Sequence, residues 1–366
     1  MFYLNSFCKC FLFFFVLCWA APSNAFQVLT PAEEFIVDSI DNRLASASDP
    51  AVDVGNPMNS LRRFSTLQHL ANTAFPDGNY VNNLGSWAAD LDLTSIYVWN
   101  SRRADHLKGT NGGVLVSPRH LSIAAHYPDE LRAGDTVRFV DRENNVVVRE
   151  IIAAMDHPLA PGVQYDVRIC LLDQDVPSSI SFSKILPENW RDHISGSVML
   201  PVLSSNQRAQ VTVRNLNFLS PFTSFREPTD SLRQPYFRDA VPGDSGAPSF
   251  LVVGDELVLL TTYTGGGAGS GPSIVDQKMA INEMMVELDM GVTNPSGYQL
   301  TEFDLTGIGE PLLGDVNLDG AVNFFDISPL IGVLISGVYL QEADTNQDGL
   351  VDFFDVSPFL AILATL

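Results

Sequence analysis

The sequence contains Gly243-Asp244-Ser245-Gly246-Ala247-Pro248, in which a serine stands among small residues. Small residues permit a tight turn whose backbone N–H groups converge on one point beside the hydroxyl. A free serine hydroxyl is a poor nucleophile at neutral pH, and it reacts only when a neighbouring base takes its proton. The stretch therefore predicts a nucleophilic serine, Ser245, together with a histidine and a carboxylate elsewhere in the chain.

Both partners have candidates upstream. Residues 112–126 hold two short apolar runs separated by Ser117-Pro118-Arg119, which predicts a β-hairpin with His126 just after its second strand. Asp166 opens a second apolar run that ends at Leu172. Each residue alone is as readily explained by an ordinary structural role. Together, in the order histidine, aspartate, serine, they predict a catalytic triad.

These three stretches resemble the signatures of chymotrypsin/trypsin-like serine proteases, which run close to T-A-A-H, D-I-A-L-L and G-D-S-G-G-P. The order of His126, Asp166 and Ser245 is that of this family, and Ala247 stands where an α/β-hydrolase elbow would need glycine. The resemblance covers residues 85–295. It implies two six-stranded β-barrels with the active site between them, and an oxyanion hole made by the backbone N–H groups of Gly243 and Ser245.

The pattern of apolar residues also predicts a mainly β domain. Between residues 94 and 290 the chain alternates short apolar runs with Gly, Pro, Asn and Asp, and helical periodicity is confined to 281–288. The predicted strands cover residues 94–99, 136–140, 146–152, 198–203, 210–213 and 257–263. Such spacing is typical of an all-β sandwich or barrel.

The resemblance also suggests substrate-binding residues. Asp239 corresponds to the base of the primary pocket, where an aspartate pairs with a substrate Lys or Arg; alternatively, it is a surface residue. Thr262, Tyr263 and Thr264 occupy the place of the segment that binds substrate backbone as an added strand, and Thr264 would narrow the pocket mouth. The glycine-rich stretch 265–271 is either a pocket wall or a plain surface connection.

The N-terminus predicts an exported protein. Residues 1–25 combine Lys9, an apolar run over 11–21 and small residues at 23–25, which is typical of a secretory signal peptide. The alternative is a retained membrane anchor, but the run is short for a bilayer span. We therefore expect a secreted, periplasmic or cell-surface protein without stable membrane insertion.

Charge and cysteine content narrow the partners. The formal net charge is −22, with 21 basic and 43 acidic residues, so bulk charge does not favour nucleic acid or anionic lipid. Cys8, Cys10 and Cys18 lie in the predicted signal peptide. Cys170 alone remains, which excludes an intramolecular disulfide in the mature chain, and its apolar run predicts a small buried side chain.

Residues 26–84 read as an N-terminal extension or a propeptide. Short helices are predicted over 31–40 and 59–75, and Arg62-Arg63 is either a processing site or a solvated pair. No Arg-Ile-Val-Gly-Gly sequence precedes the hairpin, so the usual activation route of the family lacks its N-terminus. Asp244 would then be held by an internal arginine or by backbone N–H groups.

A repeat follows a linker at residues 296–313. Residues 314–329 recur as 343–358, and each copy places oxygen-bearing side chains at loop positions 1, 3, 5, 9 and 12, with glycine at position 6. This is the pattern of a calcium-binding loop. The expected ligands of two calcium ions are Asp315, Asn317, Asp319, Asn323 and Asp326, then Asp344, Asn346, Asp348, Asp352 and Asp355, with the carbonyls of Ala321 and Leu350.

The duplicated loops of residues 314–366 resemble type I dockerin domains, which are small and α-helical. The resemblance implies a cohesin-like or cell-surface partner; the alternative is a self-contained calcium-stabilised tail. Phenylalanine pairs at 324–325 and 353–354 replace polar residues used by many dockerins, and we expect Pro329 and Pro358 to interrupt the helices after the loops.

The sequence therefore favours a secreted serine endopeptidase that hydrolyses peptide bonds of a protein or peptide substrate and carries a calcium-binding module. Two alternatives stay open. One is a protease-fold binding protein that has lost turnover, and the other is a calcium-dependent surface or adhesion protein.

Overall fold

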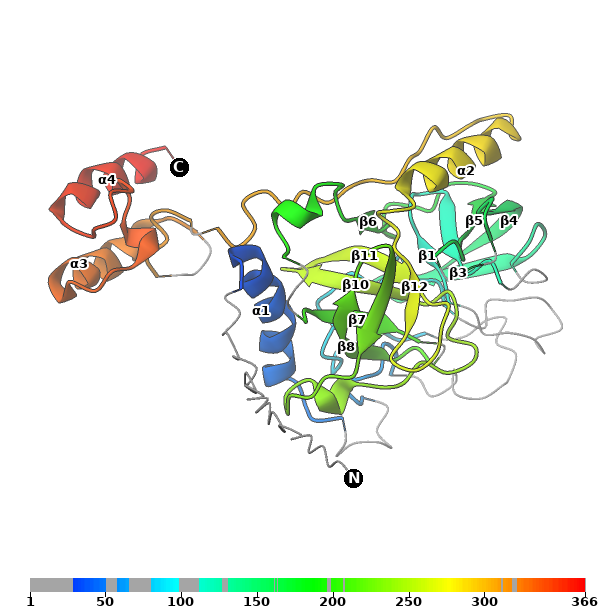
Figure 1. The fold of residues 1–366 in the computed structure, drawn as a ribbon, viewed down its shortest axis with the longest axis horizontal. Helices are drawn as coiled ribbons and strands as arrows, with labels where there is room; N and C mark the ends of the chain where they lie inside the picture. The colour runs from blue at the N-terminus through cyan, green and yellow to red at the C-terminus, as the bar shows by residue number, and fades with distance from the viewer. Residues whose placement is uncertain are drawn as a thin grey trace, which may run out of the picture.

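The computed structural model describes residues 29–50, 58–65, 80–98, 112–126, 131–160, 162, 164–195, 199–206, 208–310, 312–317 and 321–365. The predicted signal peptide lies outside these residues. The chain is mainly β, with two sheets and a few short helices near its C-terminus (Figure 1). Within the described residues, no helix has the length and apolar character needed to span a bilayer.

The first sheet has five antiparallel strands in the order β1-β2-β5-β4-β3. The predicted hairpin before His126 is confirmed, with Leu115 paired to Leu121. The predicted strand over 136–140 is confirmed at both ends. The strands are β1 Val114–Leu115, β2 His120–Ile123, β3 Thr136–Val140, β4 Val146–Asp156 and β5 Arg168–Leu172.

The second sheet has seven strands in the order β12-β9-β8-β7-β10-β11-β6 and curls into a half-barrel (Figure 1). Only the β11–β6 pair is parallel among its described pairings. The strands are β6 Lys184–Ile185, β7 Pro201–Ser205, β8 Val211–Phe218, β9 Phe222–Arg226, β10 Pro248–Val253, β11 Glu256–Thr262 and β12 Ser270–Pro272.

The six strands expected in each barrel are not found among the described residues, where the two sheets hold five and seven strands. Of the predicted strand at 94–99, residues 94–98 are described and form no regular strand: Thr94 and Ser95 lie in a turn, and Ile96 makes one bridge with Val114. The Asp92 carboxylate accepts the backbone N–H of Thr94 at 3.0 Å and its hydroxyl at 2.6 Å. This local side-chain contact stabilises a turn in competition with a strand.

The N-terminal helix is α1, Pro31–Ser46, and it lies against β10 and β7 of the second sheet (Figure 1). Thr30 caps it through a capping box with Glu33, which confirms the helix predicted from residue 31. The helix predicted over 59–75 is wrong for residues 59–65, which form turns because the Asn59 side chain accepts the N–H of Leu61.

Arg62 and Arg63 are held against the β body. Arg62 forms a bridge with Gln210, and the buried Arg63 guanidinium donates to the backbone oxygen of Ile96 at 2.9 Å. In this conformation the dibasic pair is not the solvated pair that the sequence allowed.

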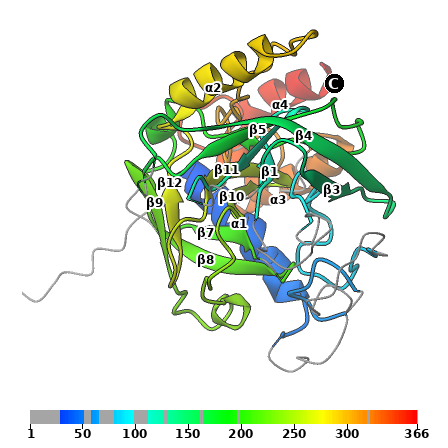
Figure 2. The ribbon, with the colours of Figure 1, turned by 90° about the vertical axis from the view of Figure 1, so that its right-hand side faces the viewer.

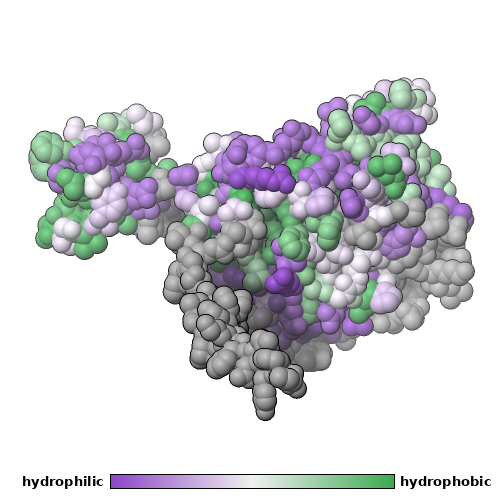
Figure 3. Space-filling view, in the orientation of Figure 1, coloured by the Kyte–Doolittle hydropathy of each residue, from purple (hydrophilic) through white to green (hydrophobic). Residues whose placement is uncertain are grey.

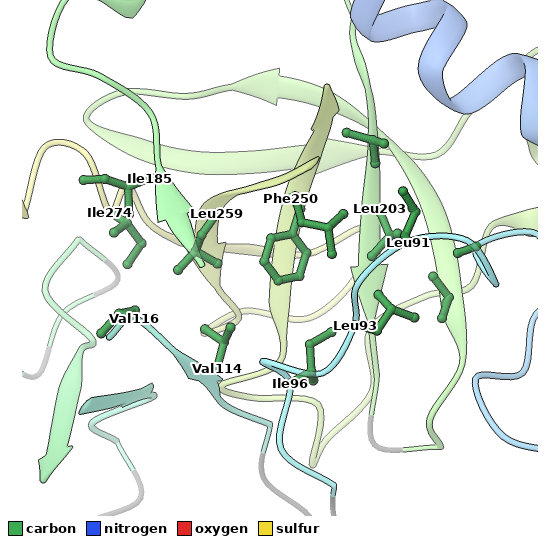
Figure 4. Packing of buried hydrophobic residues seen from close by; sticks show 14 of the residues in the cluster. Leu91, Leu93, Ile96, Val114, Val116, Ile185, Leu203, Phe250, Leu259 and Ile274 are labelled. Atoms are coloured by element: carbon green, nitrogen blue, oxygen red, sulfur yellow. The ribbon is translucent and has the colours of Figure 1, made fainter. Parts of the chain in front are cut away.

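The largest core cluster joins both sheets. Figure 4 shows Ile96 and Val114, from the first half of the chain, beside Phe250 and Leu259 of β10 and β11. Burying a side chain of this size stabilises the fold by about 1.5–3 kcal/mol. The shared core holds the ends of β2 and β5 next to the start of β10.

The remaining helices are short. The predicted helix over 281–288 is confirmed as α2 Lys278–Met290, which lies on β4 and β5 (Figure 2). The others are η2 Trp190–Asp192, η3 Gln234–Tyr236, η4 Phe324–Asp326, α3 Ile327–Ser336, η5 Gln341–Ala343, η6 Phe353–Asp355 and α4 Val356–Leu363.

The C-terminal repeat forms its own core, made by Val316, Val322, Leu330, Ala343 and Phe359. Figure 1 shows α3 and α4 apart from the strands. Pro329 and Pro358 do not interrupt these helices, so that expectation is wrong. Each proline is the third residue of its helix, where the first turn leaves backbone N–H groups without helical acceptors.

Candidate functional site

Three side chains predicted to act together lie in hydrogen-bond contact. Ile123 at the end of β2 pairs with Arg168 at the start of β5, which brings His126 beside Asp166. His126 Nδ1 lies 2.6 Å from Asp166 Oδ2, and His126 Nε2 lies 3.1 Å from Ser245 Oγ. The imidazole therefore bridges the carboxylate and the hydroxyl.

Asp166 is the buried member of this trio. Its side chain is 1% exposed, whereas that of His126 is 31% exposed. Its Oδ1 accepts the backbone N–H of His126 at 2.8 Å, so both carboxylate oxygens hold the histidine. Burial alone would raise the pKa of Asp166, but hydrogen bonding by His126 and Thr264 outweighs burial and holds this pKa below its ordinary value. An ionised Asp166 fixes Nδ1 and leaves Nε2 facing the serine.

Thr264, which the sequence predicts at the pocket mouth, also belongs to the surroundings of Asp166. Its buried hydroxyl faces Asp166 without reaching ideal hydrogen-bond geometry, and it helps to lower the pKa of that carboxyl. The side chain thus helps to keep Asp166 ionised, and its role at a pocket mouth stays a prediction.

The Ser245 turn is pressed against the segment that leads into β1. The Gly112 N–H donates to Ser245 O at 2.9 Å. Gly246 has a φ of +81°, and a Cβ at this position would lie 2.2 Å from Gly112 O. Only glycine meets both demands, so Gly246 fixes Ser245 opposite the first sheet.

The Ser245 turn leaves two backbone donors unused. Within the described residues, neither the Gly243 N–H nor the Ser245 N–H donates a hydrogen bond. Gly243 adopts a φ of +102°, a conformation open to glycine. The buried Asp244 carboxylate accepts the backbone N–H of Val241 at 2.9 Å, in agreement with the expectation that backbone groups hold it.

The four residues assigned to substrate binding lie in different surroundings. Asp239 is exposed, while Thr262 and Tyr263 are buried. The Tyr263 N–H donates to Ala247 O at 2.9 Å, and its own carbonyl accepts the Gly246 N–H at 2.8 Å. A substrate strand therefore has no free backbone group to pair with at Tyr263.

Sequence reasoning missed one charged residue near this site, Arg214. It lies in β8 and is fully buried, with its guanidinium carbon 5.0 Å from the centroid of the Tyr263 ring. Arg214 shares a strand face with Thr212 and Leu216, both of them buried, so it is a charge on an otherwise interior face. This burial is evident only in the folded structure.

The two predicted calcium loops have matching local structure. Asp326 accepts the N–H groups of Asn317 and Asn323 at 3.0 and 2.8 Å, and Asp355 accepts those of Asn346 and Asp352 at 3.1 and 2.8 Å. In the second loop, Asp344 also accepts the N–H groups of Asp348 and Gly349. The backbone carbonyls of Leu350 and Ala321 are the remaining predicted ligands. Leu350 is exposed, and Ala321 holds the corresponding position in the first loop.

The charge of these loops fits a bound cation. Asp315, Asp326, Asp344 and Asp355 are at most 5% exposed, and residues 314–366 contain no Lys, Arg or His. No cluster of three or more candidate metal-binding side chains occurs among the described residues. Asp319 of the first loop lies outside that part of the chain.

Cys170 is buried in β5, as its apolar surroundings predicted, and burial raises the pKa of its thiol to about 12. The thiol is therefore protonated at neutral pH and unsuited to nucleophilic chemistry.

Comparison with known protein families finds no matching family model, and a search of curated proteins finds no match.

Proposed function

We propose that this chain is a serine endopeptidase with a chymotrypsin-like arrangement of two β-barrels. The observation that carries the proposal is the continuous contact from Asp166 through His126 to Ser245, in a turn where the N–H groups of Gly243 and Ser245 donate no hydrogen bond among the described residues. A histidine at a strand end has no structural need for a buried carboxylate on one nitrogen and a serine on the other.

In the proposed mechanism, His126 Nε2 takes the Ser245 proton as the hydroxyl oxygen attacks a peptide carbonyl. The same nitrogen then donates that proton to the leaving amine, and water releases the acyl group by the reverse sequence. The N–H groups of Gly243 and Ser245 bind the oxyanion. Loss of one such donor costs about 3–4 kcal/mol of transition-state stabilisation in other enzymes.

The C-terminal repeat is proposed to bind two calcium ions through the loop residues named above. The support is the set of four buried carboxylates without a cationic side chain among residues 314–366. Export and a cohesin-like or cell-surface partner remain part of this proposal, which rests there on the sequence resemblance.

A fluorophosphonate probe tests the reaction class, because it reacts with an activated serine. We expect the folded, calcium-loaded protein to be labelled, and we expect Ser245→Ala and His126→Ala to abolish labelling. Ser178→Ala removes an exposed serine outside the triad and should label like the wild type. Absence of labelling in the wild type would mean either an unprocessed zymogen or a binding protein, and absence that persists after trimming near Arg63 would reject the endopeptidase in favour of a binding or adhesion protein.

A further inference from the structure

Arg214 is a buried cation with no carboxylate in direct contact among the described residues. It is fully buried in β8, and one of its terminal nitrogens donates to the backbone oxygen of Ala268. Its Nε and Nη2 atoms have no hydrogen-bond partner, and no carboxylate lies within ion-pair distance of it among the described residues. Buried guanidinium groups are destabilising unless paired, so this one indicates a missing anion.

The free atoms of Arg214 are the right pair for a carboxylate. Nε–H and Nη2–H lie on one edge of the planar guanidinium, and that edge matches the two oxygens of a carboxylate in a bidentate contact. Nη1, on the other side, is already occupied by Ala268 O. The group is thus oriented by the protein, with its carboxylate-binding edge unused.

Arg214 also lies between the two segments that flank Ser245. Its guanidinium carbon is 5.4 Å from the centroid of the Phe237 ring, in the segment leading to Ser245, and 5.0 Å from that of Tyr263. The carbonyl of Tyr263 accepts the N–H of Gly246, the residue after Ser245. Further along these segments, the Ala240 N–H donates to Gly267 O at 2.8 Å, which ties them together.

We propose that Arg214 is the base of the primary specificity pocket and that the enzyme cleaves peptide bonds on the carboxyl side of Glu or Asp. The substrate carboxylate supplies the acceptors that Nε and Nη2 lack. The inference rests on the proposed endopeptidase activity. It assigns the pocket a preference opposite to that of Asp239, which is exposed and so poorly placed to bind a desolvated Lys or Arg.

The test uses the full-length, calcium-loaded protein and peptides that differ only at the residue before the scissile bond. We expect cleavage after Glu or Asp, and we expect Arg214→Met to lower the ratio of Glu to Leu cleavage by about 100-fold. Fluorophosphonate labelling of Arg214→Met should persist, because the probe has no acidic side chain. Arg226→Met, which removes an exposed arginine from the adjacent strand β9, should keep the wild-type preference.

Two readouts keep the test decisive. If Arg214→Met does not fold, the wild type alone is labelled with two diphenyl phosphonates, one bearing a Glu-like and the other a Leu-like side chain. Faster labelling by the Glu-like probe supports the inference. Cleavage after Lys, Arg or apolar residues, or an unchanged preference in Arg214→Met, overturns it while the endopeptidase stands. A wild type that takes no fluorophosphonate, even after trimming near Arg63, overturns both.

Discussion

His120 and Asp289 form a second histidine–carboxylate contact, which differs from the triad in having no access to solvent. His120 Nε2 lies 3.8 Å from Asp289 Oδ1, and the two side chains are 0% and 5% exposed. The Ser117 hydroxyl lies 2.9 Å from His120 Nδ1. Burial lowers the pKa of His120 to about 4, even though the nearby Asp289 opposes this shift. The imidazole is therefore neutral at pH 7, and it packs between β2 and the end of α2 without a hydrogen bond from Nε2 to Asp289.

This depressed pKa makes stability dependent on pH. The unfolded chain binds a proton at His120 near pH 6.5 and the folded chain only near pH 4, so stability falls as the pH drops through this window. The full loss is about 3 kcal/mol. We expect thermal unfolding measured from pH 7.5 to 4 to be less pH-dependent in His120→Phe than in the wild type. His193→Phe, at a partly exposed histidine, serves as the control; equal pH dependence in all three proteins would contradict the prediction.

At the scale of single residues, local sequence was enough to name His126, Asp166 and Ser245, because each stands in a recognisable stretch. It was not enough for Thr264 or Arg214. Thr264 gains its role only when the chain after β11 passes behind Asp166. Arg214 gains its role only when β8 places it under Phe237 and Tyr263. Such contacts depend on three-dimensional packing that no local pattern encodes.

Among the elements, the turn before β10 carries the serine, and its geometry depends on Gly246. Alanine there would need a left-handed backbone, which costs about 1–2 kcal/mol. Its Cβ would also lie 2.2 Å from Gly112 O, an overpacking that adds about 1–3 kcal/mol. The turn would move away from the segment before β1, and with it the Ser245 hydroxyl would leave His126.

We expect Gly246→Ala to lose fluorophosphonate labelling by at least about tenfold and to lower the unfolding temperature. Gly307→Ala is the matched control, because Gly307 has a φ of +73° but nothing within 4 Å of its would-be Cβ. It should show the backbone strain alone, about 1 kcal/mol, with normal labelling. Comparable losses in both variants would mean that the contact with Gly112 is unimportant.

Strands were predictable where the apolar run and the turn residues beside it indicated the same structure. The run 136–140 alternates and ends at Asp141, whose carboxylate accepts the N–H of Asn145 at 2.7 Å and so closes the turn to β4. The run 94–99 is as apolar, but Asp92 holds its start in a turn. The competition between a side-chain contact and a sheet ladder is decided by neighbours that the run itself does not contain.

At the scale of the whole molecule, the chain builds separate cores. The largest cluster of the β body spans both sheets and two others each lie on one sheet, whereas the C-terminal cluster contains residues of the repeat alone. This small core leaves Phe324, Phe325, Phe353 and Phe354 at least 73% exposed, and apolar surface is visible on the C-terminal unit in Figure 3. A core of this size needs a further source of stability, and the buried carboxylates of the loops indicate a cation.

Calcium removal should therefore act on one part of the molecule. A cation bound at 100 times its dissociation constant stabilises the unit that holds it by about 2.7 kcal/mol. We expect a chelator to lower the unfolding temperature of the C-terminal unit in calorimetry, and Asp344→Ala together with Asp355→Ala to do the same in the presence of calcium. Asp255→Ala, an exposed aspartate in the turn between β10 and β11, should have no such effect.

Ser245 labelling separates this stabilising role from catalysis. The triad draws its residues from the β body, whose clusters share no residue with the C-terminal core, so labelling should be equal with calcium and with chelator. Loss of labelling on chelation would mean that the repeat supports the active site directly. An unchanged C-terminal transition would mean that the carboxylates of Asp326 and Asp355 are satisfied by the backbone N–H groups they already accept, without a cation.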